Sequence, residues 1–481
     1  MRGLSVGRAQ RISNWDPEDV AAWEAGNKKT ARRNLIWSVF AMHVGYSVWS
    51  IWSVMVLFMP RSVYGLSPAD KLLLGATATL VGGCLRIPYA LAVAKFGGRN
   101  WMVFSSLVLL IPTVGTILLL ANPGQPLWMY LVCAALTGMG GGNFSAAIAN
   151  VNVFYPQRLK GAALGIAGGG GNIGVPVIQI VGLVVLAAAG NRQPYWVCAI
   201  YLVLLSLAAL GSALFLDNVE LPRGEHKPVR AALVQRDTWV LAMLYVATYG
   251  SFIGFSFAFG QVLQMNYMAT GQGALQASLH AAQVAFLGPL LASLARMYGG
   301  RLSDRLGGGP VTLGVLLAMI AAVSGLIAVS AHADNRSGPL SAASMTGYIS
   351  GFMALFVLCG IGNGAVYKMI PAVFESRSHS MNVAEAERRH WARAMSGVVI
   401  GIVSAIGTLG GVLINLALRQ SYLSTGSETT AFCSFLLCYL IGSVLTWWMY
   451  VRRPSAVRRT LIAAQAAPEL SELSPANTFG S

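Results

Sequence analysis

The chain has 481 residues, of which 55% are hydrophobic and only 10% are charged, and its formal net charge is +16. This composition excludes an ordinary soluble domain, because so few polar residues could not cover its surface. The basic charge would suit a nucleic-acid-binding protein, but the distribution of that charge along the chain argues against one.

Twelve apolar stretches follow a polar N-terminal segment, and each is long enough to cross a bilayer as a helix. Backbone groups in hydrocarbon must be bonded within the spanning structure, and these stretches are too long and too uniformly apolar for barrel strands. We therefore expect an all-α integral membrane protein, with a first span that is too long to be a removable signal peptide. The expected spans are 35–59, 72–95, 101–121, 127–154, 161–189, 195–216, 239–264, 280–302, 309–331, 347–374, 394–418 and 430–451.

The longest charged connection lies in the middle of the twelve spans and divides them into two bundles of six helices. The expected segments are a cytoplasmic N-terminal segment 1–33, a bundle 34–216, a cytoplasmic linker 217–237, a bundle 238–453 and a disordered tail 454–481. All six cysteines fall in apolar spans without metal-binding spacing, so no metal or other cofactor is expected.

Positive charge is distributed unevenly between the two sides of the expected membrane protein. Of the 33 Lys and Arg residues, 25 fall on the termini, loops and adjoining span ends of one side, five fall on the other side, and three fall deep inside spans. This asymmetry follows the positive-inside rule and predicts that both termini are cytoplasmic. It accounts for the basic charge without nucleic acid as a partner.

Two arginines occupy corresponding places in the two halves. Arg86 and Arg296 each precede a Gly-Gly pair by eleven residues, and the second copy lies 210 residues after the first. Charged side chains at bilayer depth are costly and usually functional. None of the 17 acidic residues lies deep in a span. The sequence therefore predicts a central anion site between two arginines. The alternative is that the arginine side chains reach the membrane surface or donate to backbone carbonyls.

Glycine is concentrated in three spans, at 138–142, 165–174 and 401–411. Small residues let membrane helices approach closely and also let them bend. Both uses suit helices that slide or rock during transport, although ordinary close packing explains any single glycine. No Gly-Lys-Ser/Thr follows these clusters, so a phosphate-binding loop is excluded. Neither a nucleotide motif nor a nucleophile-base pair suggests an enzyme.

Long motifs in the fourth and fifth spans carry a family resemblance. The runs Gly140 to Pro156 and Gly161 to Gly174 resemble the nitrate signature of the nitrate/nitrite porter family, NarK type, of the major facilitator superfamily. Shorter matches support it, at 15–19, 86–89, 244–256, 299–308 and 404–411. The resemblance implies two pseudo-symmetric six-helix bundles that bind substrate at the midplane between them.

The resemblance also implies roles for individual residues. Nitrate or nitrite would be held by Arg86 and Arg296, with further hydrogen bonds from Tyr245 and Asn172 and aromatic walls formed by Phe144, Tyr249 and Tyr46. Tyr249 stands where the family often has Phe. The guanidinium fork of arginine suits a planar oxyanion, because it donates paired hydrogen bonds in one plane and keeps its charge.

Two further titratable residues, His43 and Lys368, fall inside expected spans. The resemblance associates such a pair with proton symport, because histidine titrates near neutral pH and burial lowers the pKa of lysine. We expect nitrate/proton symport by a monomer in the inner or plasma membrane. Nitrate/nitrite exchange, transport of another small or organic anion, and a nitrate sensor or partner-binding scaffold derived from a transporter remain as alternatives.

Overall fold

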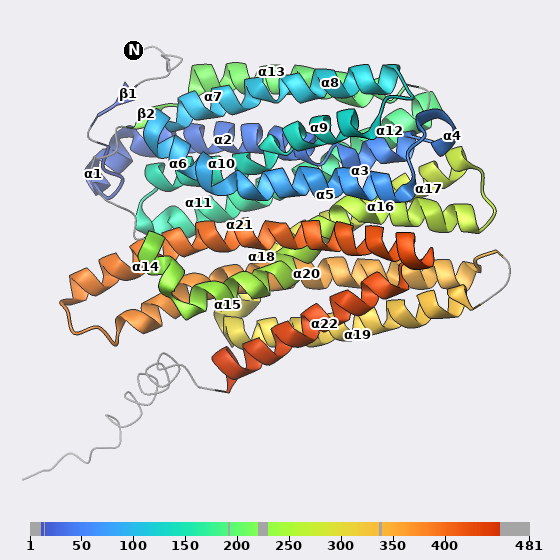
Figure 1. Cartoon of the computed structure of the whole chain (residues 1–481). Coiled ribbons are helices and arrows are strands. Elements are labelled where there is room, and N and C mark those ends of the chain that lie inside the picture. Colours follow the sequence, from blue (N-terminus) through green and yellow to red (C-terminus); the bar gives the residue numbers. More distant parts are fainter. Residues whose placement is uncertain (1–10, 14, 191–192, 220–228, 336–338, 453–481) are drawn as a thin grey trace, which may run out of the picture.

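The structure is a computed structural model that describes residues 11–13, 15–190, 193–219, 229–335 and 339–452 (Figure 1). Within these residues, eleven helices are long and apolar enough to span a membrane. The bent pair α5 (Pro68–Cys84) and α6 (Arg86–Phe96) makes a twelfth span if it is counted as one. The predicted helical membrane fold is therefore confirmed. The predicted tail 454–481 lies outside the described residues.

The elements of the first half of the chain are drawn from blue to green in the upper part of Figure 1. They are β1 (Arg11–Ile12), α1 (Val20–Ala22), η1 (Trp23–Asn27), α2 (Lys28–Trp49), α3 (Trp52–Met55), η2 (Val56–Phe58), α4 (Arg61–Tyr64), α5, α6, α7 (Gly98–Val108), α8 (Leu110–Ala121), α9 (Leu127–Thr137), α10 (Met139–Phe154), α11 (Gln157–Asn172), α12 (Gly174–Ala189), α13 (Tyr195–Phe215) and β2 (Asn218–Val219).

The second half lies below it and runs from green to red. Its elements are α14 (Val229–Val234), α15 (Arg236–Tyr245), the π-helical turn η4 (Val246–Gly250), α16 (Ser251–Ala269), α17 (Ala274–Ala285), α18 (Leu287–Leu306), α19 (Gly308–Asp334), α20 (Ala342–Ser378), α21 (Glu385–Thr425), α22 (Thr429–Thr446) and η5 (Trp447–Val451).

The halves meet along two helix pairs that the internal repeat relates to each other. Helix α5 of the first half packs against α21 of the second, and α11 packs against α18. These are the second and eleventh spans and the fifth and eighth spans, so the interface has the pseudo-symmetry that two parallel repeats produce. Both arginine-bearing spans therefore line the interface between the halves.

The interface is hydrogen-bonded at the end of the molecule that lies away from the N-terminal elements. Gln264 and Ser278 of the second half donate to the backbone carbonyl of Leu57, at 3.3 and 2.9 Å. Gln261 donates to the carbonyl of Pro68 at 2.6 Å. Backbone carbonyls of one half therefore accept from side chains of the other, which holds the halves together at this end.

The N-terminal segment is folded against the first bundle. Strands β1 and β2 pair in parallel, a two-residue departure from an all-helical fold. Trp15 contacts Phe154 with ring centroids 5.3 Å apart. Arg33 pairs with the fully buried Asp217 at 2.6 Å, which ties the start of the expected linker to this bundle. Helix α2 begins at Lys28, earlier than the apolar run that predicted it, because hydropathy marks membrane depth rather than helix ends.

Candidate functional site

A break in the second span positions Arg86. Helix α5 ends at Cys84, α6 begins at Arg86, and the two are bent by 40° relative to each other. The Arg86 side chain is only 1% exposed. A kink of this size has to expose or redirect backbone groups, so it is typical of functional positions in membrane helices. The break thus places one guanidinium group in the interior of the protein.

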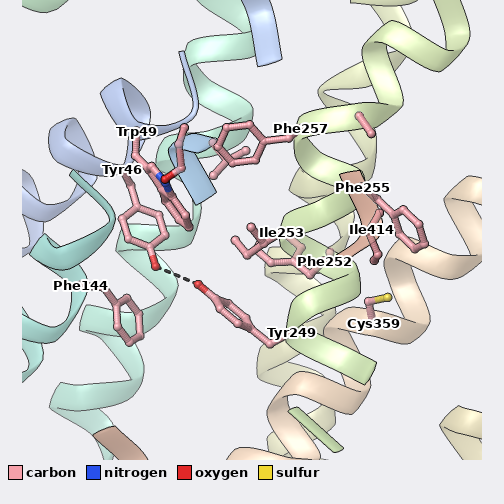
Figure 2. Close-up of a cluster of buried hydrophobic side chains, with 14 of the residues drawn as sticks. Tyr46, Trp49, Phe144, Tyr249, Phe252, Ile253, Phe255, Phe257, Cys359 and Ile414 are labelled. Atoms are coloured by element: carbon pink, nitrogen blue, oxygen red, sulfur yellow. Dashed lines mark hydrogen bonds between the residues drawn. The ribbon is translucent and has the colours of Figure 1, made fainter. Parts of the chain in front are cut away.

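Aromatic side chains from both halves surround the Arg86 guanidinium, and Figure 2 shows three of them, Tyr46, Phe144 and Tyr249. Its Nη2 donates to the hydroxyl of Tyr46 and, at 2.5 Å, to the hydroxyl of Tyr249. The two hydroxyls also bond to each other at 2.9 Å. The Arg86 Cζ lies 4.9 Å from the ring centroid of Phe144 and 5.0 Å from that of Tyr249, within the range of cation–π attraction.

Arg296 lies in the middle of α18, partly buried, on the other side of the same region. Its Cζ is 5.2 Å from the ring centroid of Tyr367. Its Nη2 lies 3.8 Å from the position that a Cβ on Gly168 would occupy, and the ring of Phe144 lies 3.9 Å from that position. Phe144 therefore stands between the two arginines, and Gly168 leaves open the space that Arg296 faces.

The tyrosines of the seventh span complete the aromatic lining. Tyr245 and Tyr249 stack with centroids 4.9 Å apart and planes 11° apart, and both are fully buried. A Cβ on Gly407 would clash with the Tyr245 ring, so this glycine provides room for the ring. Tyr245 lies within electrostatic range of both Arg86 and Arg296. The predicted residues from the two halves are therefore gathered in one place.

Several buried polar atoms of this region have no hydrogen-bond partner among the described residues. They are Nε and Nη1 of Arg86, Nη1 of Arg296, the hydroxyl of Tyr245 and Oδ1 of Asn172. Asn172 is 1% exposed and ends α11, one helical turn beyond Gly168. Unpaired buried donors are costly, so a cluster of them is typical of a ligand-binding site. Donors predominate in this cluster, so a ligand would have to bring acceptor atoms.

Within the part of the chain that the structure describes, no carboxylate forms an ion pair with Arg86 or Arg296. The buried acids lie elsewhere, at helix ends: Asp217 pairs with Arg33, Asp237 with Arg377, and Glu428 contacts Asn266. Among the described residues, Arg86 donates to two tyrosine hydroxyls and lies near two aromatic rings, and Arg296 lies near the ring of Tyr367. An anion would supply the countercharge that the described residues do not.

The two predicted proton-coupling residues lie in different environments. His43 of α2 is partly buried, and its Nδ1 lies 3.1 Å from the carbonyl of Gly170, on the same helix as Asn172. Lys368 was expected at bilayer depth near the arginines, but its side chain is 51% exposed and pairs with Asp304 at 2.8 Å. The long lysine side chain reaches the end of the bundle, where an acid is available. The structure therefore brings His43 close to the site and keeps Lys368 out of it.

Tyr367 is a contact of Arg296 that the sequence interpretation missed. A single aromatic residue in an apolar span usually indicates packing, so it carried no signal by itself. A weak signal exists in the repeat: Gly-x-Gly-Asn occurs at 140–143 and again at 360–363. Phe144 follows the first copy directly, and Tyr367 lies one turn after the second, so both arginines receive an aromatic neighbour from corresponding spans.

Curated relatives match this chain over nearly its whole length. It is 31% identical to the "Nitrate/nitrite transporter NarU" of Escherichia coli, an alignment that covers 92% of this chain and 96% of the relative. It is 32% identical to the Salmonella typhimurium protein of the same name, with the same coverage. It is 29% identical to the "Probable nitrate/nitrite antiporter NarK2" of Thermus thermophilus, over 94% and 98% of the two chains.

The fold has a counterpart among solved structures. A crystal structure of a mutant of the nucleoside transporter NupG superposes with a TM-score of 0.60 over 87% of this chain and all of the other, at 9% identity. At that identity the likeness concerns the fold alone. The model of the Major Facilitator Superfamily matches residues 36–413. With its two halves and its central site, the chain belongs to the Major Facilitator Superfamily.

Proposed function

We propose that this protein is a secondary active transporter of nitrate and nitrite that works by alternating access between its two halves. The observation that carries the proposal is the pair of arginines, one from each half, with unpaired N–H groups and no carboxylate partner among the described residues. The names of the relatives support the identity of the substrate. Each half supplies one arginine, so a bound anion would attract the halves toward each other.

The chemistry of the site favours a small planar anion. In this proposal, Nε and Nη1 of Arg86 and Nη1 of Arg296 donate to the anion's oxygens, together with the Tyr245 hydroxyl and the amide NH2 of Asn172. Phe144 and Tyr249 would flank the plane of the ion. A weakly hydrated monovalent ion loses little on leaving water, whereas sulfate or phosphate would lose far more than these donors return.

The membrane orientation follows from charge. We place both termini in the cytoplasm, because most of the Lys and Arg residues lie on that side, and we place the protein in the cytoplasmic membrane as a monomer. The end sealed by Gln264, Ser278 and Leu57 then faces outward. In this arrangement the substrate site is closed toward the outside, and Arg296 keeps partial exposure.

For the coupling mode we favour proton symport through His43. Its ring is partly buried and bonded to the Gly170 carbonyl two residues before Asn172, so a change in its charge would act on the helix that lines the site. Lys368 is left out of this proposal because Asp304 neutralises it. Nitrate/nitrite exchange is the second candidate, since one relative is named an antiporter.

Binding and flux measurements test the substrate. Isothermal titration of the purified protein should show binding of nitrate and nitrite, and binding of acetate and sulfate weaker by at least about tenfold. In proteoliposomes, nitrate uptake should follow an imposed pH gradient or a gradient of internal nitrite. Acetate binding as tight as nitrate binding would point to an organic anion instead, and flux driven by nitrite alone would favour exchange.

A further inference from the structure

The Tyr249 hydroxyl makes a buried polar contact across the two halves. Tyr249 belongs to η4 of the second half, and it accepts a hydrogen bond from Arg86 of the first half at 2.5 Å. Tyr46, which lies in the same half as Arg86, accepts from the same nitrogen and bonds to the Tyr249 hydroxyl. Figure 2 shows the two rings reaching toward each other from opposite sides. All three side chains are at most 1% exposed.

Tyr245 provides a contrast within the same helix. It lies one turn before Tyr249, and the two rings stack, yet its hydroxyl has no partner among the described residues. The unpaired hydroxyl of Tyr245 is available to a bound anion. The hydroxyl of Tyr249 has a protein partner, because it accepts from Arg86. Of these two stacked tyrosines, Tyr245 can therefore donate to a bound anion, whereas the Tyr249 hydroxyl is bonded to Arg86.

The Arg86–Tyr249 contact affects the step in which the transporter returns without substrate. Net transport requires the empty site to pass through the closed arrangement on its way back, whereas exchange never does. In the empty site, Arg86 and Arg296 carry like charges from opposite halves, and their repulsion opposes closure. A buried hydrogen bond to a charged group is among the stronger ones, so the Arg86–Tyr249 contact offsets part of that repulsion.

We propose that the Tyr249 hydroxyl is a positioning group that stabilises the closed empty transporter and thereby permits net uptake in addition to exchange. This inference rests on the proposed anion transport at the same site. The hydroxyl links the halves through Nη2 of Arg86, a nitrogen that the anion does not use. When an anion is bound, it joins the halves as a second link, so losing the hydroxyl has its largest effect on the empty transporter. A phenylalanine at this position keeps the ring and removes this link together with the hydroxyl–hydroxyl bond to Tyr46.

The test compares two transport modes in the same proteoliposomes. Tyr249→Phe is measured for net nitrate uptake driven by a pH gradient and for exchange against internal nitrate. Loss of one charged hydrogen bond predicts that the ratio of net uptake to exchange falls about tenfold, which corresponds to about 1.4 kcal/mol. A ratio taken within one preparation does not depend on how much protein folds or is reconstituted.

Two matched variants separate the alternatives. Tyr245→Phe removes a hydroxyl that serves the anion, so it should reduce both modes and leave the ratio near that of the wild type. Tyr46→Phe removes a contact of Arg86 within one half and only a neutral hydroxyl–hydroxyl bond across the halves, so it should lower the ratio less than Tyr249→Phe does. The inference is overturned if Tyr249→Phe changes both modes in the same proportion, or if the wild-type protein exchanges nitrate without any net uptake. Absence of nitrate flux in both modes of the wild-type protein would instead contradict the proposed function.

Discussion

Replacing Arg86 by lysine tests the anion site most directly. The guanidinium group uses Nη2 for the two tyrosine hydroxyls and leaves Nε and Nη1 for the ligand, while its plane lies near the rings of Phe144 and Tyr249. A lysine keeps the charge but has one nitrogen, which cannot serve the hydroxyls and both oxygens of the anion in one plane. The substitution therefore removes the planar set of hydrogen-bond donors and keeps the positive charge.

The expected magnitude follows from the number of donors lost. At least one charge-assisted hydrogen bond to the anion disappears, which is about 1.5–3 kcal/mol. The dissociation constant for nitrate should rise by about tenfold to a hundredfold. Isothermal titration on the purified protein measures it, and flux in proteoliposomes should fall in parallel. Arg301→Lys, on an exposed position of α18, is the matched control. If Arg86→Lys bound nitrate within about twofold of the wild type, the two-guanidinium site would be the wrong explanation.

Three further predictions address other parts of the molecule. His43→Gln should remove the pH dependence of nitrate uptake in proteoliposomes while nitrate binding at fixed pH persists; unchanged pH dependence would remove His43 from the coupling scheme. Gly168→Leu should block nitrate binding, because its side chain would enter the space between Arg296 and Phe144, whereas Gly165→Ala, which meets nothing within 4 Å, should be tolerated. Glu428, in the connection between α21 and α22, has a pKa raised by burial, so the folded protein holds this proton more tightly than the unfolded chain does and loses stability as pH rises above the usual carboxyl range. Glu428→Gln should therefore raise the melting temperature at pH 7 relative to the wild type, and the difference should shrink near pH 4, as thermal unfolding at both pH values would show.

The pattern of spans and the two arginines could be predicted from the sequence because both follow from solvation. Hydrocarbon requires long apolar helices, and it makes an arginine within one of them costly enough to be noticed. The absence of acids from the spans is also a property of the sequence, so the need for an anion could be inferred before any contact was known. The long motifs of the fourth and fifth spans then indicated which residues surround that anion.

Only the tertiary structure decided which atoms meet. Whether the Tyr249 hydroxyl faces the ligand or Arg86 depends on the rotation of η4 and on the approach of α2 from the other half. The same applies to Tyr367, whose ring reaches Arg296, and to Lys368, whose flexible side chain pairs with Asp304 instead of entering the site. Hydropathy fixes the depth of a residue along a helix, but the direction of its side chain is fixed by helix packing between residues far apart in the chain.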